Sequence, residues 1–145
     1  MASTYVWSKE LETGNALIDS QHKQLLQAIN DLVDACAAGK GRASLAKTLD
    51  FLESYTAKHF GDEEKLQMQH KYPGYANHKR LHDGFKSTVA ELSRQLKADG
   101  PTILLVGKVN ASIGGWLIKH IKAEDTKVGA HIASLPKQQA AVTRP

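Results

Sequence analysis

Cysteine is almost absent from this sequence: Cys36 is the only one in 145 residues. A single thiol excludes an intrachain disulfide and a zinc site built from several cysteines. Cys36 follows the apolar residues Leu32 and Val33. We therefore expect it to be a small thiol buried in the core.

Long hydrophobic runs are also missing. The most apolar stretch, residues 103–121, is interrupted by Lys108, Asn110, Ser112 and Lys119, whereas a membrane-spanning helix needs about 20 consecutive apolar residues. The first residues show no basic segment followed by an apolar one, so they do not read as a signal peptide. The sequence predicts no membrane insertion and a cytoplasmic location.

The sequence carries only a small excess of charge of one sign. Lys and Arg number 19 and Asp and Glu 15, which gives a formal net charge of +4 and a pI of about 9.2. Basic residues alternate with acidic ones, a pattern typical of solvated helix surfaces rather than of a nucleic-acid-binding face. A nucleic-acid partner is not expected, and a metal-free structural bundle or basic nucleic-acid binder is the least favoured interpretation.

Proline is rare, and strand-type alternation is not evident. Breaks fall at residues 39–41, 71–74 and 99–101. Between them apolar residues recur at helical spacing. The pattern predicts an all-α, antiparallel up-down-up-down four-helix bundle. The expected helices span about residues 19–38, 43–69, 75–98 and 101–127, with Pro101 at a first helical position.

One domain is expected over residues 1–135. Its first part, residues 1–18, reads as an extended arm anchored by Trp7 and Ile18. Residues 136–145 read as a flexible basic tail.

Five of the seven histidines lie on the predicted apolar faces, together with two carboxylates. They are His22, His59, His78, His82 and His120, with Glu63 and Asp125. Burying a carboxylate without compensation costs several kcal/mol. A bound cation is the simplest way to offset this cost. His70 and His131 stand near loops, and we expect both on the surface.

The spacing of these histidines predicts that they meet. Residues on neighbouring antiparallel helices share a level when the turn lies halfway between them. The midpoint of His22 and His59 falls near residue 40, and that of His82 and His120 falls at Pro101. The midpoint of His59 and His78 falls close to the remaining break. The seven residues should therefore converge in one layer of the core.

Five imidazoles and two carboxylates are too many ligands for one tetrahedral zinc ion. Divided over two metals that share the carboxylates, they leave a position for a small ligand. Imidazole with carboxylate suits iron, although manganese, zinc or cobalt can occupy such sites. Carboxylate-rich di-iron bundles use Glu-x-x-His motifs, and this sequence contains none. The nitrogen-rich set favours ligand binding over substrate oxidation.

The residues around the histidines form a set of short motifs. In chain order they are Trp7; Ile18-Asp19-x-x-His22; His59-Phe60-x-x-Glu63-Glu64; Tyr72-Pro73-x4-His78-x3-His82-x2-Phe85; and Trp116-Leu117-x2-His120-Ile121-x3-Asp125. As a set over about residues 7–128, this pattern resembles the bacterial hemerythrins. One departure is Gln67, where many members of that family carry methionine.

The resemblance implies a specific site. One iron would be bound by His78, His82 and His120, and the other by His22 and His59. Glu63 and Asp125 would bridge the two irons beside an oxo or hydroxo group, and dioxygen would bind at the two-histidine iron. The implied apolar oxygen pocket consists of Leu25, Phe60, Trp116, Leu117 and Ile121.

The function implied by this resemblance is reversible dioxygen binding for storage, transport or delivery, without catalysis apart from a minor peroxidase-type activity. Two alternatives stay open: an oxygen or redox sensor module, and an enzyme that reduces peroxide or nitric oxide. The expected partners are dioxygen and an oxygen-accepting or signalling protein. In the sensor alternative the N-terminal arm or the basic tail would report binding.

Overall fold

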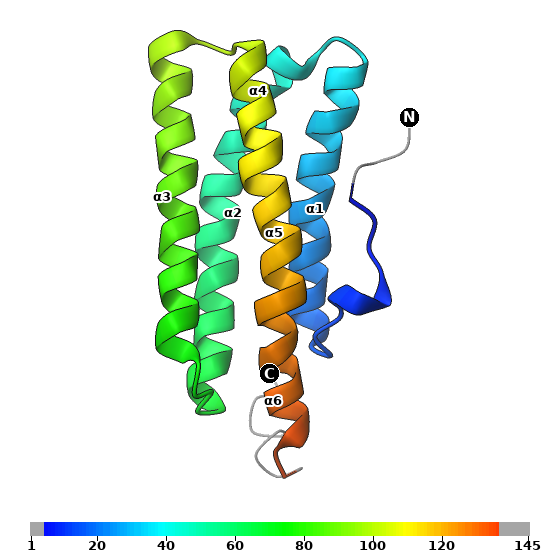
Figure 1. Ribbon diagram of the computed structural model, residues 1–145, viewed down its shortest axis with the longest axis vertical. Helices are drawn as coiled ribbons and strands as arrows, with labels where there is room; N and C mark the ends of the chain where they lie inside the picture. The colour runs from blue at the N-terminus through cyan, green and yellow to red at the C-terminus, as the bar shows by residue number, and fades with distance from the viewer. Residues whose placement is uncertain (1–4, 137–145) are drawn as a thin grey trace.

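The computed structural model describes residues 5–136, and within them all regular structure is helical. The bundle is built from four helical segments, called columns below. Three columns are single helices: α1 (Ala16–Ala37), α2 (Gly41–Gln69) and α3 (Tyr75–Asp99). The fourth column is continuous and consists of α4 (Ile103–Val109), η2 (Asn110–Gly114), α5 (Gly115–His120), η3 (Ile121–Asp125) and α6 (Thr126–Ser134). The columns lie side by side and alternate in direction (Figure 1). The predicted all-α four-helix bundle is confirmed.

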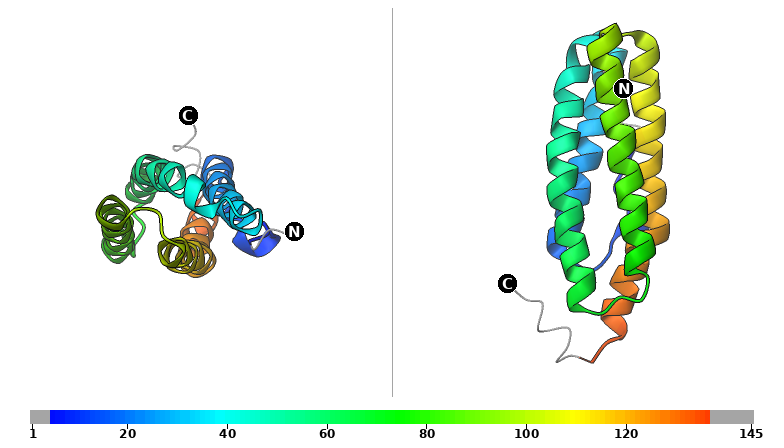
Figure 2. Two further views of the ribbon diagram at one scale, coloured as in Figure 1. Left: turned by 90° about the horizontal axis from the view of Figure 1, so that it is seen from above. Right: turned by 90° about the vertical axis from the view of Figure 1, so that its left-hand side faces the viewer.

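Seen from above, the four columns surround a common interior (Figure 2). The apolar faces predicted from the sequence fill it, because helical spacing places their side chains on one side of each column. Its fully buried members include Leu25, Ile29, Leu52, Phe85 and Ile113. Cys36 does not belong to it: its side chain is exposed, so the predicted buried thiol is wrong. The last buried residue of α1 is Leu32, and Cys36 lies in the final turn beyond it.

Three helix starts differ from the prediction: α2 begins at Gly41, two residues early, and the other two shifts follow from capping residues. α1 begins at Ala16 because the Asn15 side chain accepts a hydrogen bond from the Ile18 amide, at 3.0 Å. The fourth column begins at Ile103 because the Thr102 hydroxyl accepts one from the Leu105 amide, at 3.1 Å. Ser, Thr and Asn are favoured at this position because they satisfy free backbone amides. Pro101 therefore precedes the helix and is not its first residue.

The fourth column also ends later than predicted, at Ser134 rather than near residue 127. Val128 is buried, so the apolar face continues past the expected end. Of the predicted tail, residues 137–145 lie outside the described part of the chain.

The N-terminal arm packs against the bundle, as Figure 1 shows beside α1. The Asn30 side chain accepts from the Tyr5 amide at 3.0 Å and donates to the Tyr5 carbonyl at 2.7 Å. Leu11, in the short 3-10 turn η1 (Lys9–Leu11), is buried. Trp7 packs against the core with the Lys23 ammonium 5.2 Å from its ring centre. Trp7 packs against the core and Ile18 is buried, so both positions suit residues that anchor the arm.

Gly129 allows the backbone of the arm to approach the fourth column closely, because it has no side chain. A Cβ at this position would lie 2.0 Å from the Thr13 carbonyl oxygen, a backbone atom. Gly129→Ala should lower the free energy of unfolding by roughly 1–3 kcal/mol through overpacking. Gly61→Ala is the matched control, because a Cβ there meets nothing within 4 Å. It should stabilise its helix by about 0.5–1 kcal/mol. Thermal unfolding measures both, and equal melting temperatures would contradict the close packing.

Candidate metal centre

The seven side chains predicted to meet come from all four columns. His22 lies on α1, His59 and Glu63 on α2, His78 and His82 on α3, and His120 and Asp125 on the fourth column. Each is at most 5% exposed. Their ligand atoms form two groups, in each of which all such atoms lie within 4.8 Å of one another. The first contains Glu63, His78, His82, His120 and Asp125, and the second contains His22, His59, Glu63 and Asp125.

Helix geometry explains how these residues reach one level. His59 and Glu63 are four residues apart, as are His78 and His82, a spacing that places both members on one face of an α-helix. His120 and Asp125 are five apart, which in an α-helix would turn them away from each other. The intervening segment η3 is a π-helix, whose wider turn suits a spacing of five residues. His120 Nε2 consequently lies 3.2 Å from Asp125 Oδ1.

Each carboxylate contacts histidines of both groups. Asp125 Oδ1 lies 2.9 Å from His78 Nε2, and Asp125 Oδ2 lies 3.0 Å from His22 Nε2. Glu63 Oε1 lies 3.1 Å from His82 Nε2 and 3.5 Å from His59 Nε2. The Nε2 atoms of all five rings therefore face the two carboxylates, an arrangement suited to two cations that share them.

Several polar atoms of this cluster are buried and lack a hydrogen-bond partner among the described residues. The outward Nδ1 atoms of His22 and His78 are among them, and toward the centre of the cluster they are His82 Nε2, Glu63 Oε1 and both carboxylate oxygens of Asp125. The central atoms lie close to opposite partners without the directional geometry of a hydrogen bond. His78 Nε2 and His120 Nε2 are also only 3.1 Å apart. Buried polar atoms are normally paired, and cations between the central atoms would satisfy them. The donor set thus fits a pair of metal ions.

Burial and mutual charge shift the pKa values of the cluster in opposite directions. Burial and the charge of His22 lower the pKa of His59 to about 3. Burial and the charges of His78 and His120 lower that of His82 to about 2. Both rings are therefore neutral at pH 7, the form of imidazole that binds metals.

For His22, burial lowers the pKa, but the carboxylates of Asp125 and Glu63, 3.0 Å and 3.2 Å from its Nε2, outweigh burial and raise the pKa to about 9. Burial and the charge of Asp125 raise the pKa of Glu63. A metal that binds here must displace the proton of His22, so metal uptake should release protons.

The outward-facing nitrogens of two histidines have partners that the sequence analysis did not single out for a role. His82 Nδ1 lies 2.9 Å from Glu64 Oε2. His59 Nδ1 lies 2.7 Å from Gln21 Oε1, and Gln21 Nε2 donates to Asp62 at 2.7 Å. A signal for Gln21 was present in the sequence: it stands three residues after Ile18 and four before Leu25, so a polar side chain occupies a core position.

The predicted oxygen-pocket residues pack around the cluster. Four of them, Leu25, Phe60, Leu117 and Ile121, are at most 2% exposed, and Trp116 is partly buried. Phe60 stacks on the His82 ring at 3.9 Å and Trp116 on the His120 ring at 4.3 Å. Phe85, which the predicted pocket omits, completes this aromatic group 4.5 Å from Trp116.

His70 is not on the surface as predicted: it is 4% exposed, and its Nδ1 lies 2.9 Å from the Leu66 carbonyl. Its position in the turn that ends α2 turns the ring inward, where it satisfies a helix-end carbonyl. His131 is half-buried, with Nε2 3.0 Å from the His70 carbonyl. Gln67 is fully buried, one turn beyond Glu63.

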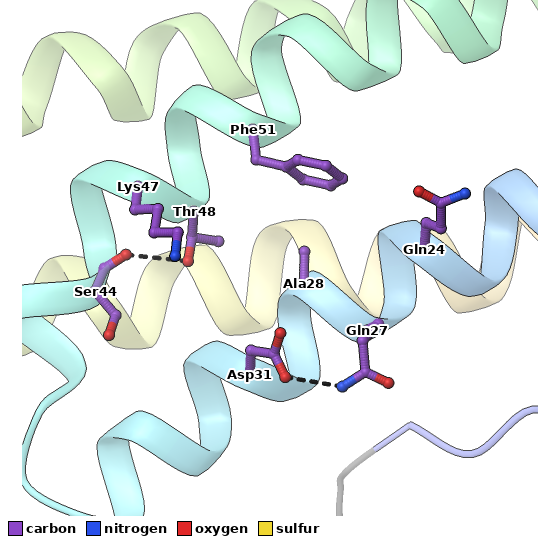
Figure 3. Close-up of a pocket in the computed structure, with 8 residues that line it drawn as sticks. All are labelled: Gln24, Gln27, Ala28, Asp31, Ser44, Lys47, Thr48 and Phe51. Atoms are coloured by element: carbon purple, nitrogen blue, oxygen red, sulfur yellow. Dashed lines mark hydrogen bonds between the residues drawn. The ribbon is translucent and has the colours of Figure 1, made fainter.

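Two hollows differ in their position relative to the cluster. A groove of about 350 Å³ between α1 and α2 is lined by Phe51, Ala28 and polar side chains (Figure 3), and none of its lining residues belongs to the cluster. A narrow crevice of about 10 Å³ does border Glu63 and Asp125, and Thr13 of the arm also lines it.

Residues 13–132 match the family described as "Hemerythrin HHE cation binding domain". The chain is 29% identical to a bacteriohemerythrin of Stenotrophomonas maltophilia over 92% of this chain and 87% of that protein. It is 35% identical to a bacteriohemerythrin of Pseudomonas aeruginosa over 83% and 76%. It is 36% identical to the myohemerythrin of Sipunculus nudus over 85% and 89%.

Among solved structures, a wild-type hemerythrin crystal structure matches with a TM-score of 0.77 and 27% identity, over 91% of this chain and 100% of that one. Fold and site together define a four-helix bundle with a histidine-rich, cation-binding core. The chain belongs to the hemerythrin family. The predicted family and fold are confirmed.

Proposed function

We propose that this chain binds dioxygen reversibly at a non-haem di-iron centre. His78, His82 and His120 would hold one iron and His22 and His59 the other, and Glu63 and Asp125 would be shared by both. The observation that carries this proposal is the pair of buried groups that share both carboxylates. When bound, a di-iron pair supplies electrons to dioxygen and recovers them on release.

The unequal size of the two groups supports binding at one particular iron. The group with three histidines offers five ligand residues and the group with two offers four. The iron with fewer protein ligands keeps a coordination position for an exogenous molecule. Leu25, one turn from His22, and Phe60, next to His59, are both fully buried. Apolar walls of this kind exclude water and favour a small neutral ligand.

Visible absorption of the iron-loaded protein tests the function. The reduced protein is prepared without air, exposed to oxygen and then purged. A charge-transfer band that forms with oxygen and fades on purging supports reversible binding. Direct conversion to the oxo-bridged diferric spectrum would instead mean that oxygen is consumed. Stopped-flow measurement of peroxide consumption then tests the enzymatic alternative.

A sensor role is the second candidate, because the arm packs beside the helix that carries Asp125. Thr13 lines the crevice that borders this carboxylate, and its carbonyl abuts Gly129. Oxygen-dependent hydrogen exchange in residues 5–15 would support this role, and unchanged protection would contradict it. None of the helices within residues 5–136 has both the length and the hydropathy of a membrane-spanning segment. The cytoplasmic location stays a prediction.

A further inference from the structure

The outward nitrogens of the metal-facing histidines do not all meet the same chemistry. With Nε2 directed at the metal, the Nδ1 atom carries the proton and can donate a hydrogen bond outward. Among the described residues, the Nδ1 atoms of His22 and His78 are buried without such a partner, whereas those of His59 and His82 have one. On the three-histidine side, His82 Nδ1 meets the Glu64 carboxylate directly, at 2.9 Å. On the two-histidine side, His59 Nδ1 meets the Gln21 amide.

The orientation of Gln21 follows from its two partners. A carboxylate only accepts hydrogen bonds, so the Gln21 Nε2 must be the atom that faces Asp62, at 2.7 Å. Its Oε1 is then free to accept from His59 Nδ1, at 2.7 Å. Gln21 is 2% exposed, which keeps water from replacing either contact. The result is a relay from imidazole through amide to carboxylate.

We propose that Gln21 is a positioning residue that moderates the electron donation of His59 to the two-histidine iron, an inference that rests on the di-iron function proposed above. A carboxylate that accepts from Nδ1 makes an imidazole more basic and a stronger donor to its metal. A neutral amide does so less, and the Asp62 charge acts only through it. The oxygen-binding iron is thereby less stabilised in its oxidised state than a direct carboxylate would make it.

The double variant Q21E/D62N tests this inference because it exchanges the amide and the carboxylate without changing net charge. The carboxylate then accepts directly from His59, and the amide at position 62 can donate to it. We expect full iron loading, a lower midpoint potential and autoxidation of the oxygenated protein that is faster by roughly tenfold, within the range known for outer partners of metal ligands. Wild-type potential and autoxidation rate at full iron loading would overturn the inference.

The single variant Asp62→Asn gives a second test of opposite sign at a less buried position. It removes the charge from the end of the relay, so the midpoint potential should rise and autoxidation should slow. A purely structural role for the relay predicts no such reversal between the two variants, and the absence of a reversal would overturn the inference.

The zinc-loaded protein supplies a readout that does not depend on oxygen. Zinc is diamagnetic, so proton–nitrogen-15 correlation NMR can follow the proton bound to His59 Nδ1. Its resonance should move downfield in Q21E/D62N and upfield in D62N, and unchanged resonances would overturn the role of Gln21. If wild-type protein instead forms no oxygen-dependent band, the proposed function fails while the NMR result still decides the relay.

Discussion

Asp125→Ala should abolish iron binding at both positions and remove all oxygen-dependent absorption. Asp125 belongs to both ligand groups, and its two oxygens contact His78, His120 and His22. Partners outside the ligand set of a metal already account for 10- to 100-fold in affinity, so loss of a shared ligand should cost at least about 100-fold. Iron content after loading and the visible spectrum measure the effect.

His59→Ala should give a different, graded result. His59 belongs only to the smaller group, so the five-residue group remains complete. We expect about one iron per chain to be retained and the oxygen band to disappear. Glu124→Ala is the matched control for Asp125→Ala, since Glu124 is the neighbouring carboxylate, lies outside both ligand groups and forms an ion pair with Lys127 at 3.7 Å. Two irons retained in Asp125→Ala, or an oxygen band in His59→Ala, would contradict the assignment.

The positions of the histidines could be predicted from the sequence because the turns fix them. In an antiparallel bundle with short connections, level is set by distance from the turn, and this distance can be counted. Apolar spacing then sets the face. Both properties depend on local geometry, so the meeting of residues from α1, α2, α3 and the fourth column followed without a structure.

The errors arose where tertiary contacts override local pattern. Cys36 matched the spacing of the apolar face, but the last turn of α1 extends beyond the core, so the thiol is exposed. His70 stands in a turn, yet its ring satisfies the Leu66 carbonyl and is buried. The relay through Gln21 depends on two side-chain orientations that no spacing encodes. The π-helical turn between His120 and Asp125 was not predicted either, although their five-residue spacing is a sign of it.

Removing the metal should lower the melting temperature of the wild-type protein by on the order of 10 °C. Five imidazoles and two carboxylates are buried together, and each uncompensated ionised group costs several kcal/mol. A ligand present at 1,000 times its dissociation constant stabilises the folded state by about 4 kcal/mol, which for a chain of this size corresponds to roughly 10 °C or more. Calorimetry before and after chelation and dialysis measures the difference. Asp125→Ala, which lacks the site, should show no response to the chelator.

The relative stability of wild type and Glu63→Met should depend on whether the metal is bound. Glu63 is 4% exposed, and burial opposes its ionisation, as its raised pKa indicates. Without metal, its raised pKa of about 8 keeps the Glu63 carboxyl largely protonated at pH 7, and His22 keeps Asp125 as a charged partner at 3.0 Å. An apolar side chain of similar volume therefore leaves no charge unpaired and removes the cost of burying a polar group. Without metal, the variant should therefore be at least as stable as wild type. With iron, wild type should be the more stable protein, because only it retains both shared carboxylates. A variant that is less stable than a chelator-insensitive wild type would show that internal ion pairs, rather than cations, hold the cluster together.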